Sequence, residues 1–559
     1  MIVRAPVNLQ IRGKKGDDLH GLMQHWPLTV DRILDHAARW HGAREIVTRS
    51  IDGPLVRTTY AQIHARASRL SSGLLALGVQ QGDRIATLAW NTDRHMEVWY
   101  ATMGLGAICH TLNPRLYVEQ LTYVINHAAD RILFTDKSFL PIVDLILPNC
   151  PTIEHVILMS GDDEIGRAGG AKLLAYEAVL QGHAPAIWGG FDEQLAAGLC
   201  YTSGTTGEPK GVLYSHRSNF IHTLLTLQKD VMALSSCDTV LPIVPMFHAN
   251  AWGLIFAAPA VGAKIVMPGA RMEGGAIYEL LETEGVTFSA AVPTVWQSLL
   301  DYLIATQAKL TTLKRVVIGG AACPEHLIRT FHERFGVEVM HGWGMTEMSP
   351  VGTVNCPKAK HAGLPAAEAF KLSLKQGRPL FGVEMKIVDG EGNELPRDGK
   401  AFGDLLVKGP WVMREYYKSE GRKPLTADGW FPTGDVATID ADGYLQITDR
   451  SKDVIKSGGE WISSIDLENI AIGHPAVMEA AVIGVRHPKW DERPLLIVVK
   501  KSGAEISRDS MLRFYEGKVA RWCVPDDVVF VEQLPHTATG KLSKLTLREQ
   551  FKDYRLPTV

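Results

Sequence analysis

A loop rich in glycine and small hydroxyl residues constrains this chain more than any other stretch. It runs from Tyr201 to Gly211 and reads Tyr-Thr-Ser-Gly-Thr-Thr-Gly-Glu-Pro-Lys-Gly. Glycines let backbone N–H groups approach an anion closely, and the hydroxyls and the ammonium of Lys210 add donors and positive charge. The stretch therefore predicts a phosphate-binding loop, with a plain polar turn as the alternative.

Two familiar phosphate loops do not fit this stretch. A P-loop requires a lysine followed by serine or threonine, whereas Lys210 lies between Pro209 and Gly211. The dinucleotide-binding fingerprint also fails, because Gly104 and Gly106 lack the third glycine. The loop therefore indicates a different class of phosphate site.

Apolar runs of strand length alternate with helix-length segments through much of the chain. Apolar side chains recur at intervals of three and four over Tyr60–Leu77, which predicts a helix closed by Gly78. Strands are predicted at Arg84–Trp90, Ile132–Thr135, Thr239–Val244, Lys264–Met267, Thr287–Ala291, Arg315–Ile318 and Val337–Met340, with helices at Met96–Gly106 and Gly275–Glu284. This rhythm favours parallel sheets covered by helices, so the predicted fold class is α/β.

A charged segment near residue 450 predicts a domain boundary. After a polar excursion at Lys358–Leu380, short strands punctuated by glycine predict a small β-rich lobe that ends near Arg450. The segment Asp449–Asp453 is charged and poor in apolar residues, and a new compact pattern follows it. We therefore predict a large N-terminal domain of residues 1–450 and a small α+β domain of residues 451–559.

Composition narrows the classes of function. The net charge of −3 at pH 7 gives no polybasic signal, which argues against a nucleic-acid partner. Seven cysteines are dispersed without a C-x-x-C pair, so neither a zinc site nor a disulfide framework is indicated, and a reducing, cytoplasmic location is expected. The N-terminus lacks the apolar core of a signal peptide, and the longest apolar run, Trp252–Met267, is too short and too interrupted to span a membrane.

The loop Tyr201–Gly211 resembles the phosphate loop of the AMP-forming adenylating enzymes, the superfamily of acyl-CoA synthetases, peptide-synthetase adenylation domains and beetle luciferases. The resemblance covers the chain from about Asp31 to Tyr554 and is closest to bacterial medium- and long-chain fatty acyl-CoA synthetases. It implies that ATP phosphates and Mg²⁺ meet the loop, with Thr205 also near the metal. The loop residues concerned are Thr202, Ser203, Gly204, Thr205, Thr206, Gly207 and Lys210.

A second motif, His341–Glu347, resembles the family's G-Y-G-x-T-E segment. The resemblance implies that Thr346 binds phosphate and that Glu347 reaches Mg²⁺, while a plain surface carboxylate is the alternative for Glu347. Trp343, between Gly342 and Gly344, stands where tyrosine is usual. Stacking on adenine survives that change, but a phenolic hydrogen bond would not.

Two further motifs resemble the walls of the nucleotide site. The segment Gly319–Pro324 resembles the backbone that lines adenine, which implicates Gly320, Ala321 and Ala322; a strand-to-helix turn is the alternative. The segment Gly429–Asp435 resembles the ribose motif, and its alternative is an Asx-turn. An acceptor-only carboxylate at Asp435 suits two ribose hydroxyls, and Arg450 would add a contact.

The segment Lys452–Ser463 resembles the hinge and glycine loop of the superfamily's mobile C-terminal domain. A hinge residue at Lys452 must absorb a large change in φ and ψ, which an exposed charged side chain tolerates. Gly459 matches the position that lines the pantetheine tunnel, and Lys456 and Trp461 belong to the same cofactor-binding segment.

Near the C-terminus, the segment Pro535–Lys541 resembles the family's P-x-T-x-T-G-K motif, which makes Lys541 the catalytic candidate. An ammonium on a flexible stem can bridge the substrate carboxylate and the α-phosphate. Ordinary exposed lysines are the alternative for both Lys452 and Lys541.

The acyl pocket carries fewer signals. The segment Pro245–Gly253 resembles the place where His248 lies beside the acyl carbonyl, and Ala291–Trp296 is the predicted second wall. A buried core histidine is the alternative for His248, and Phe247 and Trp252 equally fit core packing.

The implied reaction has two steps. A carboxylate and MgATP give acyl-AMP and pyrophosphate, and the thiol of coenzyme A then displaces AMP. The resemblance implies a medium- or long-chain fatty acid. The alternatives are a short thioether acid of the methylthiopropionate type, an aryl acid, a stand-alone loader of a carrier protein and a luciferase-type oxygenase.

A non-catalytic nucleotide-binding protein is a rival of another class. It would be expected to have lost Lys541, Glu347 or Asp435, and all three are present. A homodimer stays open, and so does the length of the acid, because pocket depth depends on side chains that folding brings together.

Overall fold

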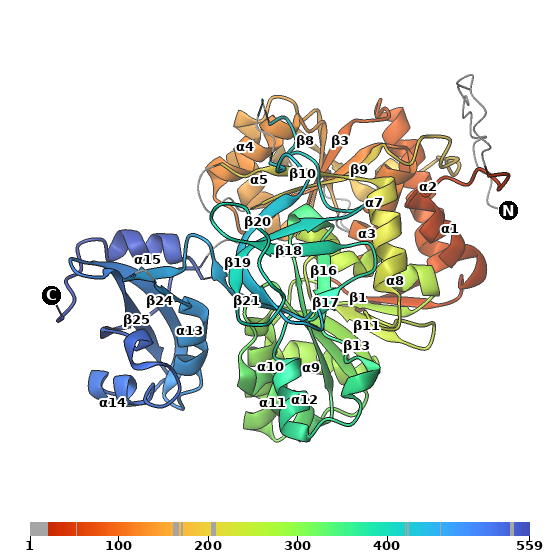
Figure 1. The fold of residues 1–559 in the computed structure, drawn as a ribbon. Coiled ribbons are helices and arrows are strands. Elements are labelled where there is room, and N and C mark those ends of the chain that lie inside the picture. Colours follow the sequence, from red (N-terminus) through yellow and green to blue (C-terminus); the bar gives the residue numbers. More distant parts are fainter. Residues whose placement is uncertain are drawn as a thin grey trace.

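The computed structural model shows a large body with a smaller one attached at its carboxyl-terminal side (Figure 1). It describes residues 21–51, 53–159, 167–168, 171–202, 208–419, 421, 424–458, 460–536 and 542–558. Among these residues, none of the helices has the length and apolar character that a bilayer crossing requires.

The first sheet has eight strands in the order β10-β9-β4-β3-β5-β6-β8-β7. Its inner pairs are parallel, and β10 and β7 pair antiparallel at the two edges. The strands are β3 (Arg84–Leu88), β4 (Ile108–Thr111), β5 (Ile132–Thr135), β6 (His155–Leu158), β7 (Arg167–Ala168), β8 (Ala171–Ala175), β9 (Ala196–Tyr201) and β10 (Gly211–Ser215). The helices of this region are α2 (Tyr60–Ala76), α3 (Asp93–Gly104), α4 (Val118–Ala128), α5 (Leu140–Ile146), α6 (Tyr176–Leu180) and α7 (His216–Thr226).

The second sheet has nine strands in the order β17-β16-β15-β14-β13-β11-β12-β1-β2. Its strands are β1 (Glu45–Arg49), β2 (Leu55–Thr59), β11 (Thr239–Pro242), β12 (Lys264–Met267), β13 (Phe288–Ala291), β14 (Arg315–Ile318), β15 (Glu338–Gly344), β16 (Val351–Val354) and β17 (Arg378–Pro379). Its helices are α1 (Asp31–Trp40), α8 (Leu254–Val261), α9 (Gly274–Thr283), α10 (Pro293–Thr306), α11 (Glu325–Phe335) and α12 (Ala366–Ser373). The strands β1 and β11 to β15 form its parallel centre.

A small antiparallel sheet completes the large body. It consists of β18 (Glu384–Val388), β19 (Phe402–Lys408), β20 (Phe431–Ile439) and β21 (Leu445–Arg450). The predicted β-rich lobe is therefore present, and its last strand ends at Arg450.

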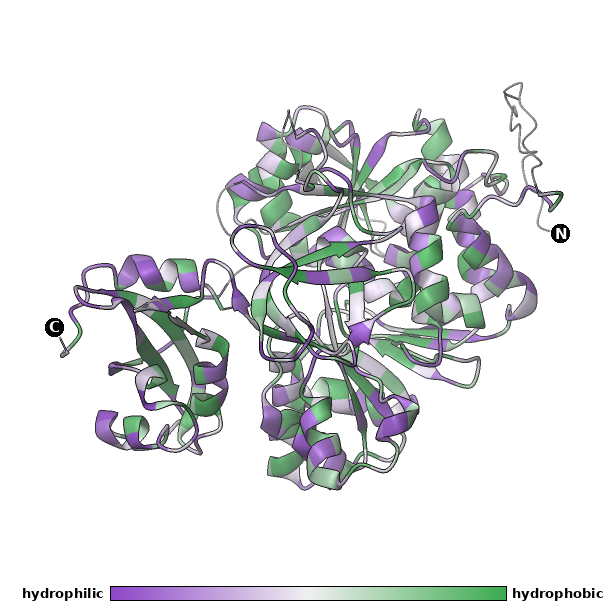
Figure 2. Ribbon diagram, in the orientation of Figure 1, coloured by the Kyte–Doolittle hydropathy of each residue, from purple (hydrophilic) through white to green (hydrophobic). Residues whose placement is uncertain are grey.

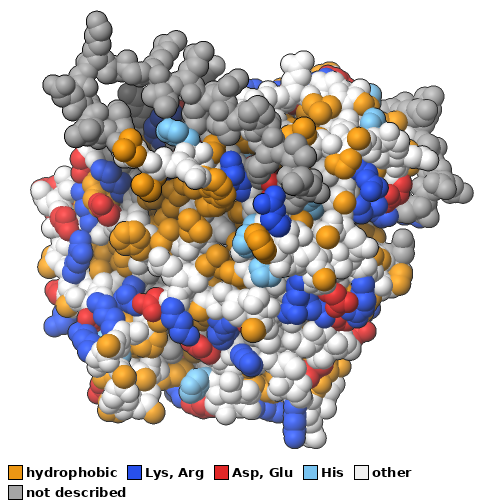
Figure 3. Space-filling model, turned by 90° about the vertical axis from the view of Figure 1, so that its right-hand side faces the viewer, with side chains coloured by type: hydrophobic (Ala, Val, Ile, Leu, Met, Phe, Trp, Pro, Cys, Tyr) orange, Lys and Arg blue, Asp and Glu red, His pale blue; other side chains and the backbone are white. Residues whose placement is uncertain are grey.

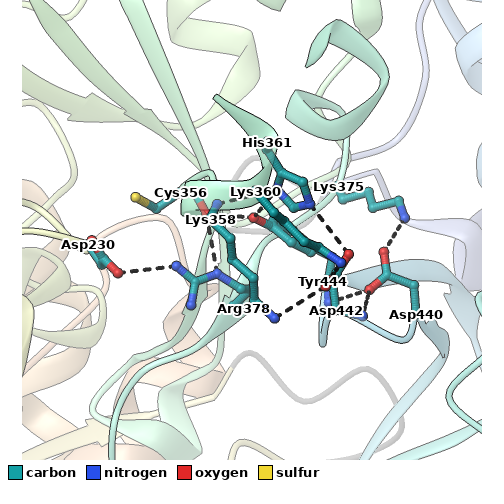
Figure 4. A network of polar contacts seen from close by, with 10 residues as sticks. All are labelled: Asp230, Cys356, Lys358, Lys360, His361, Lys375, Arg378, Asp440, Asp442 and Tyr444. Atoms are coloured by element: carbon teal, nitrogen blue, oxygen red, sulfur yellow. Dashed lines mark hydrogen bonds and ion pairs between the residues drawn. The ribbon is translucent and has the colours of Figure 1, made fainter. Parts of the chain in front are cut away.

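The stretch predicted as a polar surface excursion is tied to this lobe (Figure 4). Lys375 pairs with Asp440 at 2.6 Å, and Lys360 pairs with Asp442 at 2.6 Å. The phenol of Tyr444 donates to the carbonyl of Cys356 at 2.7 Å. The excursion and the hairpin between β20 and β21 thus form one polar cluster.

The smaller body is built on a sheet with the order β23-β22-β25-β24, and β26 pairs with β25. Figure 2 shows its long strands as mostly hydrophobic. Residues of this sheet and its helices form two hydrophobic clusters of their own. Its elements are β22 (Ile455–Ser457), β23 (Glu460–Ile462), α13 (Ser464–Ile472), β24 (Val477–His487), β25 (Asp491–Lys500), α14 (Arg508–Arg513), β26 (Asp527–Val531) and α15 (Lys544–Gln550).

The α/β class is confirmed, and β5, β12 and β14 have the predicted bounds. Two predicted ends are wrong for local reasons. The side chain of Thr92 accepts the N–H of His95 at 3.2 Å, so α3 begins at Asp93 rather than at Met96. Strand β15 continues past Met340, because Gly342 pairs with Val354 of β16.

Candidate active site

A cavity of about 450 Å³ opens where both large sheets, the β-rich lobe and the segment after β21 meet. Residues from several of the motifs, far apart in the sequence, line this cavity together. The predicted site residues on its walls are Thr202, Lys210, His248, Gly320, Gly342, Trp343, Gly344, Thr346, Glu347, Arg450 and Lys452. This convergence makes the cavity the candidate active site.

Several predicted residues are not on these walls, and Asp435 is one of them, although its neighbour Gly434 and its partners Trp343 and Arg450 are. Ala321 is exposed and Ala322 half-buried in the loop after β14, and the side chain of Lys456 in β22 is exposed. Outside the described residues lie Ser203, Gly204, Thr205, Thr206, Gly207, Gly459 and Lys541. For Trp461 the structure gives only its place in β23.

The carboxylate of Asp435 is held on both sides. The indole N–H of Trp343 donates to its Oδ2 at 2.9 Å, and Nε of Arg450 lies 2.9 Å from its Oδ1. The pairing of β20 with β21 sets Asp435 opposite Arg450. Asp435 is 5% exposed, so this oriented acceptor suits hydroxyl donors in a largely dry site.

Trp343 therefore does more than replace a tyrosine. The sequence predicts that an indole keeps stacking and loses the phenolic hydrogen bond. The structure shows that the indole N–H supplies a different hydrogen bond, to Asp435. The sequence alone gave no signal for this partner, since 92 residues separate the two side chains.

The predicted phosphate loop connects β9 to β10, which form an antiparallel pair. The N–H of Thr202 donates to the carbonyl of Lys210 at 2.9 Å, which joins the two ends of the loop. The ammonium of Lys210 lies 5.1 Å from the ring centre of Tyr416. The described ends of the loop, Thr202, Glu208 and Lys210, line the cavity.

Thr346 and Glu347 lie in a short 3₁₀ turn that follows β15. The phenol of Tyr214 donates to the carbonyl of Thr346 at 2.7 Å, and the phenol of Tyr416 donates to Oε1 of Glu347 at 2.8 Å. Both motif residues are buried, at 8% and 7% exposure. The sequence alone assigns no role to either tyrosine.

The residues at this end fit a magnesium ion brought by a nucleotide. Mg²⁺ is usually held by one or two carboxylates together with substrate phosphates and water. Glu347 supplies one carboxylate on the cavity wall. Within the described ranges no group of three or more His, Cys, Asp or Glu residues could form a protein cage, which agrees with this mode.

The apolar end of the cavity rests on an unusual backbone. Four successive residues, Ala249–Trp252, have φ between 44° and 57°, and Gly253 follows at 81°. Left-handed conformations cost energy in residues with a side chain, so the surroundings must hold this turn. One such contact is the amide of Asn250, which donates to Asn219 at 3.3 Å.

Trp252 lines this end of the cavity and is otherwise buried in the core, at 8% exposure. Its ring lies on the glycine loop after β14: a Cβ added to Gly319 or to Gly320 would be 3.5 Å from the indole. The same Cβ on Gly319 would be 2.9 Å from the carbonyl oxygen of Gly342. Glycine is therefore needed at position 319 for β15 to approach so closely, whereas the indole would be at an ordinary contact distance from either Cβ.

The predicted second wall is wrong for Trp296. That indole is fully buried in the core around α10 and donates to the carbonyls of Ala291 and Val317. Phe247 is also a core residue, at 4% exposure. His222, which no motif indicated, accepts the N–H of Val351 at 3.1 Å behind the wall.

The segment after β21 borders the cavity through Arg450, Ser451 and Lys452. The hydroxyl of Ser451 donates to Asp404 at 2.6 Å, while Lys452 is exposed. Just before this segment, Oδ2 of Asp449 accepts the N–H of Ser464 at 2.7 Å. The chain is thus anchored on both sides of the exposed lysine.

Comparison with known proteins agrees with this site. The sequence profile described as AMP-binding enzyme matches residues 34–417, and the profile of the AMP-binding enzyme C-terminal domain matches residues 466–541.

Two curated relatives match nearly end to end. A 3-methylmercaptopropionyl-CoA ligase of Ruegeria lacuscaerulensis is 52% identical over 95% of this chain and 99% of its own length. A medium-chain-fatty-acid–CoA ligase of Ectopseudomonas oleovorans is 49% identical over 96% of this chain and 98% of its own length.

Among solved structures, an anthranilate CoA ligase in complex with anthranoyl-AMP is similar. It superposes with a TM-score of 0.83 at 26% identity, over 94% of this chain and 98% of that one.

Proposed function

This chain belongs to the AMP-binding enzyme family, and on that premise we propose that it activates a short, unbranched, apolar acid, with 3-methylmercaptopropionate as the first candidate. The chain is an AMP-forming acid–thiol ligase that uses ATP, Mg²⁺ and coenzyme A.

The main support for this proposal is the position of the Trp252 indole in the cavity. The whole cavity has a volume of about 450 Å³, at the low end of ligand pockets, which run from roughly 300 to 1,000 Å³. Nucleotide and acid share it, and the indole lines its apolar end next to Gly319 and Gly320. The room left favours a short acid.

A thioether fits this seat better than a methylene does. Sulfur makes favourable contacts with aromatic rings, worth about 0.3–1.5 kcal/mol. The apolar end offers the indole of Trp252 together with Met232, Val317 and Val354. The name of the relative from Ruegeria points to the same acid.

A medium-chain fatty acid is the second candidate. The indole of Trp252 lies next to Gly319 and Gly320, and its backbone is held in a left-handed turn. Movement of that one ring would lengthen the cavity without moving the sheets. The relative from Ectopseudomonas supports this alternative.

We propose roles within the site from the geometry of the described residues and, for Thr205 and His248, from the family resemblance. Asp435, oriented by Trp343 and Arg450, accepts the ribose hydroxyls, and Lys210 faces the phosphates. Mg²⁺, when bound, offsets phosphate charge, and Glu347 with Thr205 would hold it. His248 lies beside the reacting carbonyl.

The second step requires the smaller body. We place the domain boundary after residue 450, with Lys452 as the hinge. Lys541 stabilises charge on the carboxylate and α-phosphate during adenylation, and rotation then brings Gly459 to the path of the thiol. Lys456 and Trp461 contact coenzyme A in that arrangement.

We also propose a homodimer in a reducing, cytoplasmic setting. None of the seven cysteines is in a disulfide. Figure 3 shows apolar side chains gathered on the side of the molecule that carries α1 and α7. Trp26, Trp40 and Leu224 are exposed by 50%, 70% and 51%. Sedimentation at graded concentrations should give the mass of a dimer, and a monomer at every concentration would end this proposal.

A thioester assay tests the acid. Purified protein with ATP, Mg²⁺ and coenzyme A is offered 3-methylmercaptopropionate, pentanoate as its methylene counterpart, octanoate, dodecanoate and benzoate. We expect the highest kcat/KM for 3-methylmercaptopropionate, with pentanoate next. A maximum at octanoate would select the second candidate, and a maximum at dodecanoate or benzoate would refute both.

A further inference from the structure

Tyr416 contacts both charged residues of the phosphate end. Its hydroxyl donates to Oε1 of Glu347 at 2.8 Å, and the face of its ring lies 5.1 Å from the ammonium of Lys210. Glu347 and Lys210 belong to different sheets and to different motifs. One phenol therefore connects the carboxylate expected at the metal with the cation expected at the phosphates.

The backbone around Tyr416 is fixed on both sides. The N–H of Met413 donates to the carbonyl of Glu347 at 2.8 Å, and the N–H of Tyr417 donates to the carbonyl of Gly211 at 2.8 Å. The first bond ties the segment to the motif of Glu347, and the second ties it to the strand after the phosphate loop. The position of the phenol is thus set before any ligand arrives.

The phenol remains a hydrogen-bond donor. A tyrosine hydroxyl is neutral at physiological pH, and here it donates to Oε1 of Glu347 at 2.8 Å. A neutral donor orients a carboxylate without cancelling its charge. The hydrogen bond from Tyr416 therefore leaves the negative charge of Glu347 in place.

Tyr416 also lies on a wall shared by two cavities. Both Glu347 and Tyr416 line the nucleotide cavity and a second cavity of about 810 Å³, bounded by β10 and the segment Pro410–Ser419. A side chain that served only to fill the core would not be open to two cavities. The geometry fits a group that acts on the contents of the site.

We propose that Tyr416 is a positioning residue for adenylation: its hydroxyl orients Glu347 for Mg²⁺, and its ring holds Lys210 toward the β- and γ-phosphates. This assignment rests on the proposed roles of Glu347 and Lys210. It adds a residue that neither motif contains.

This role predicts that a change at Tyr416 affects only ligands that carry β- and γ-phosphates. AMP has no β- or γ-phosphate and needs neither Glu347 nor Mg²⁺, whereas MgATP uses both. Loss of the hydroxyl should therefore weaken MgATP and spare AMP. A purely structural defect would weaken both ligands.

Calorimetric binding of MgATP and of AMP to the full chain tests this. Tyr416→Phe keeps the ring and removes the hydroxyl, so we expect MgATP to bind roughly tenfold more weakly, the order of one hydrogen bond to a charged group. The Mg²⁺ concentration for half-maximal pyrophosphate release should rise by a similar factor. Binding of AMP should be unchanged.

Tyr417→Phe is the matched control. The ring of Tyr417 packs on His127 with centroids 5.7 Å apart, so removal of its hydroxyl should leave both ligands unaffected. Tyr416→Leu, which also removes the ring, should weaken MgATP further than Tyr416→Phe does, because Lys210 loses its contact.

The variant Glu347→Gln distinguishes the proposed role of Tyr416 from the proposed metal site at Glu347, on which it rests. If Glu347→Gln raises the Mg²⁺ requirement and Tyr416→Phe does not, the assignment of Tyr416 is overturned and the site stands. If Glu347→Gln leaves the requirement unchanged, the proposed metal site and the role of Tyr416 fail together. Equal loss of AMP and MgATP in Tyr416→Phe also overturns the assignment.

Discussion

The two ends of the cavity are built by different kinds of contact. At the polar end, the carboxylate of Asp435 is fixed by a hydrogen bond from Trp343 and by an ion pair with Arg450, each 2.9 Å long. At the apolar end, Trp252 is placed by packing against Gly319 and by a turn of left-handed backbone.

The difference teaches how one fold can serve several acids. Hydrogen bonds weaken steeply away from their preferred distance and angle, so the polar end admits one arrangement. Packing tolerates apolar exchanges of similar volume at a cost usually below about 1.5 kcal/mol, so the apolar end can be altered. The nucleotide is the same for every acid, while the acid varies. Changes at the polar end should affect all acids alike, and changes at the apolar end should reorder them.

Lys541→Ala should give the largest effect, a loss of adenylation on the order of 10²-fold or more, as for removal of a transition-state donor. Binding of AMP should persist, because the polar end is complete without this lysine. Formation of the thioester from preformed acyl-AMP should also persist. Rapid-quench assays of each half-reaction measure this, with the exposed Lys552→Ala as control. Equal losses in both steps would contradict the two-conformation account.

Asp435→Ala should weaken AMP by about 1–3 kcal/mol, since ribose hydroxyls and the indole N–H of Trp343 lose their acceptor. Calorimetry with AMP gives this number. Asp428→Asn, which changes an exposed carboxylate in the same lobe, serves as control and should leave binding unchanged. Unaltered AMP affinity in Asp435→Ala would remove this residue from the site.

His222 gives a smaller effect, and it depends on pH. Burial lowers its pKa to about 3, against roughly 6.5 in the unfolded chain, so the folded state binds fewer protons between these values. Its contribution to stability is complete above pH 6.5 and is lost as the pH falls toward 3. At pH 5 the loss is at most about 2 kcal/mol, from 1.36 kcal/mol per pH unit.

His222→Gln keeps an acceptor for Val351 and does not titrate. Thermal melts at pH 7.5 and 5 should show that the stability of this variant, relative to that of the parent protein, is higher at pH 5 than at pH 7.5. The exposed His332→Gln should show no such gain. Parallel curves for all three proteins would mean that folding does not shift the pKa of His222.

The large pattern of the fold was predictable because its signals are local. Strand β12 has the bounds that its apolar run predicts, and the lobe ends at Arg450 as the charged segment indicated. The start of α3 was missed because a cap depends on one side chain, that of Thr92. The extension of β15 was missed because it depends on pairing with β16, which is a tertiary contact.

The polar end of the site was largely predictable, and the apolar end was not. Residues such as Trp343 and Glu347 lie in short motifs whose spacing is fixed along the chain. Tyr416 reaches Glu347 from 69 residues away and carries no motif. Trp296 was assigned to the acyl wall but lies in the core, since only the orientation of α10 decides which way its indole points.

The most direct test of the account is the acid profile of Trp252→Ala beside that of Asp435→Ala. Values of kcat/KM are measured over acids from pentanoate to dodecanoate, with a thermal melt for each protein. We predict that Asp435→Ala lowers kcat/KM by the same factor for every acid. Trp252→Ala should shift the maximum to longer acids, each methylene in contact adding about 0.8 kcal/mol. If Trp252→Ala instead loses about 3–5 kcal/mol of stability and keeps the parent profile, the indole is a core residue and the contrast between the two ends is wrong.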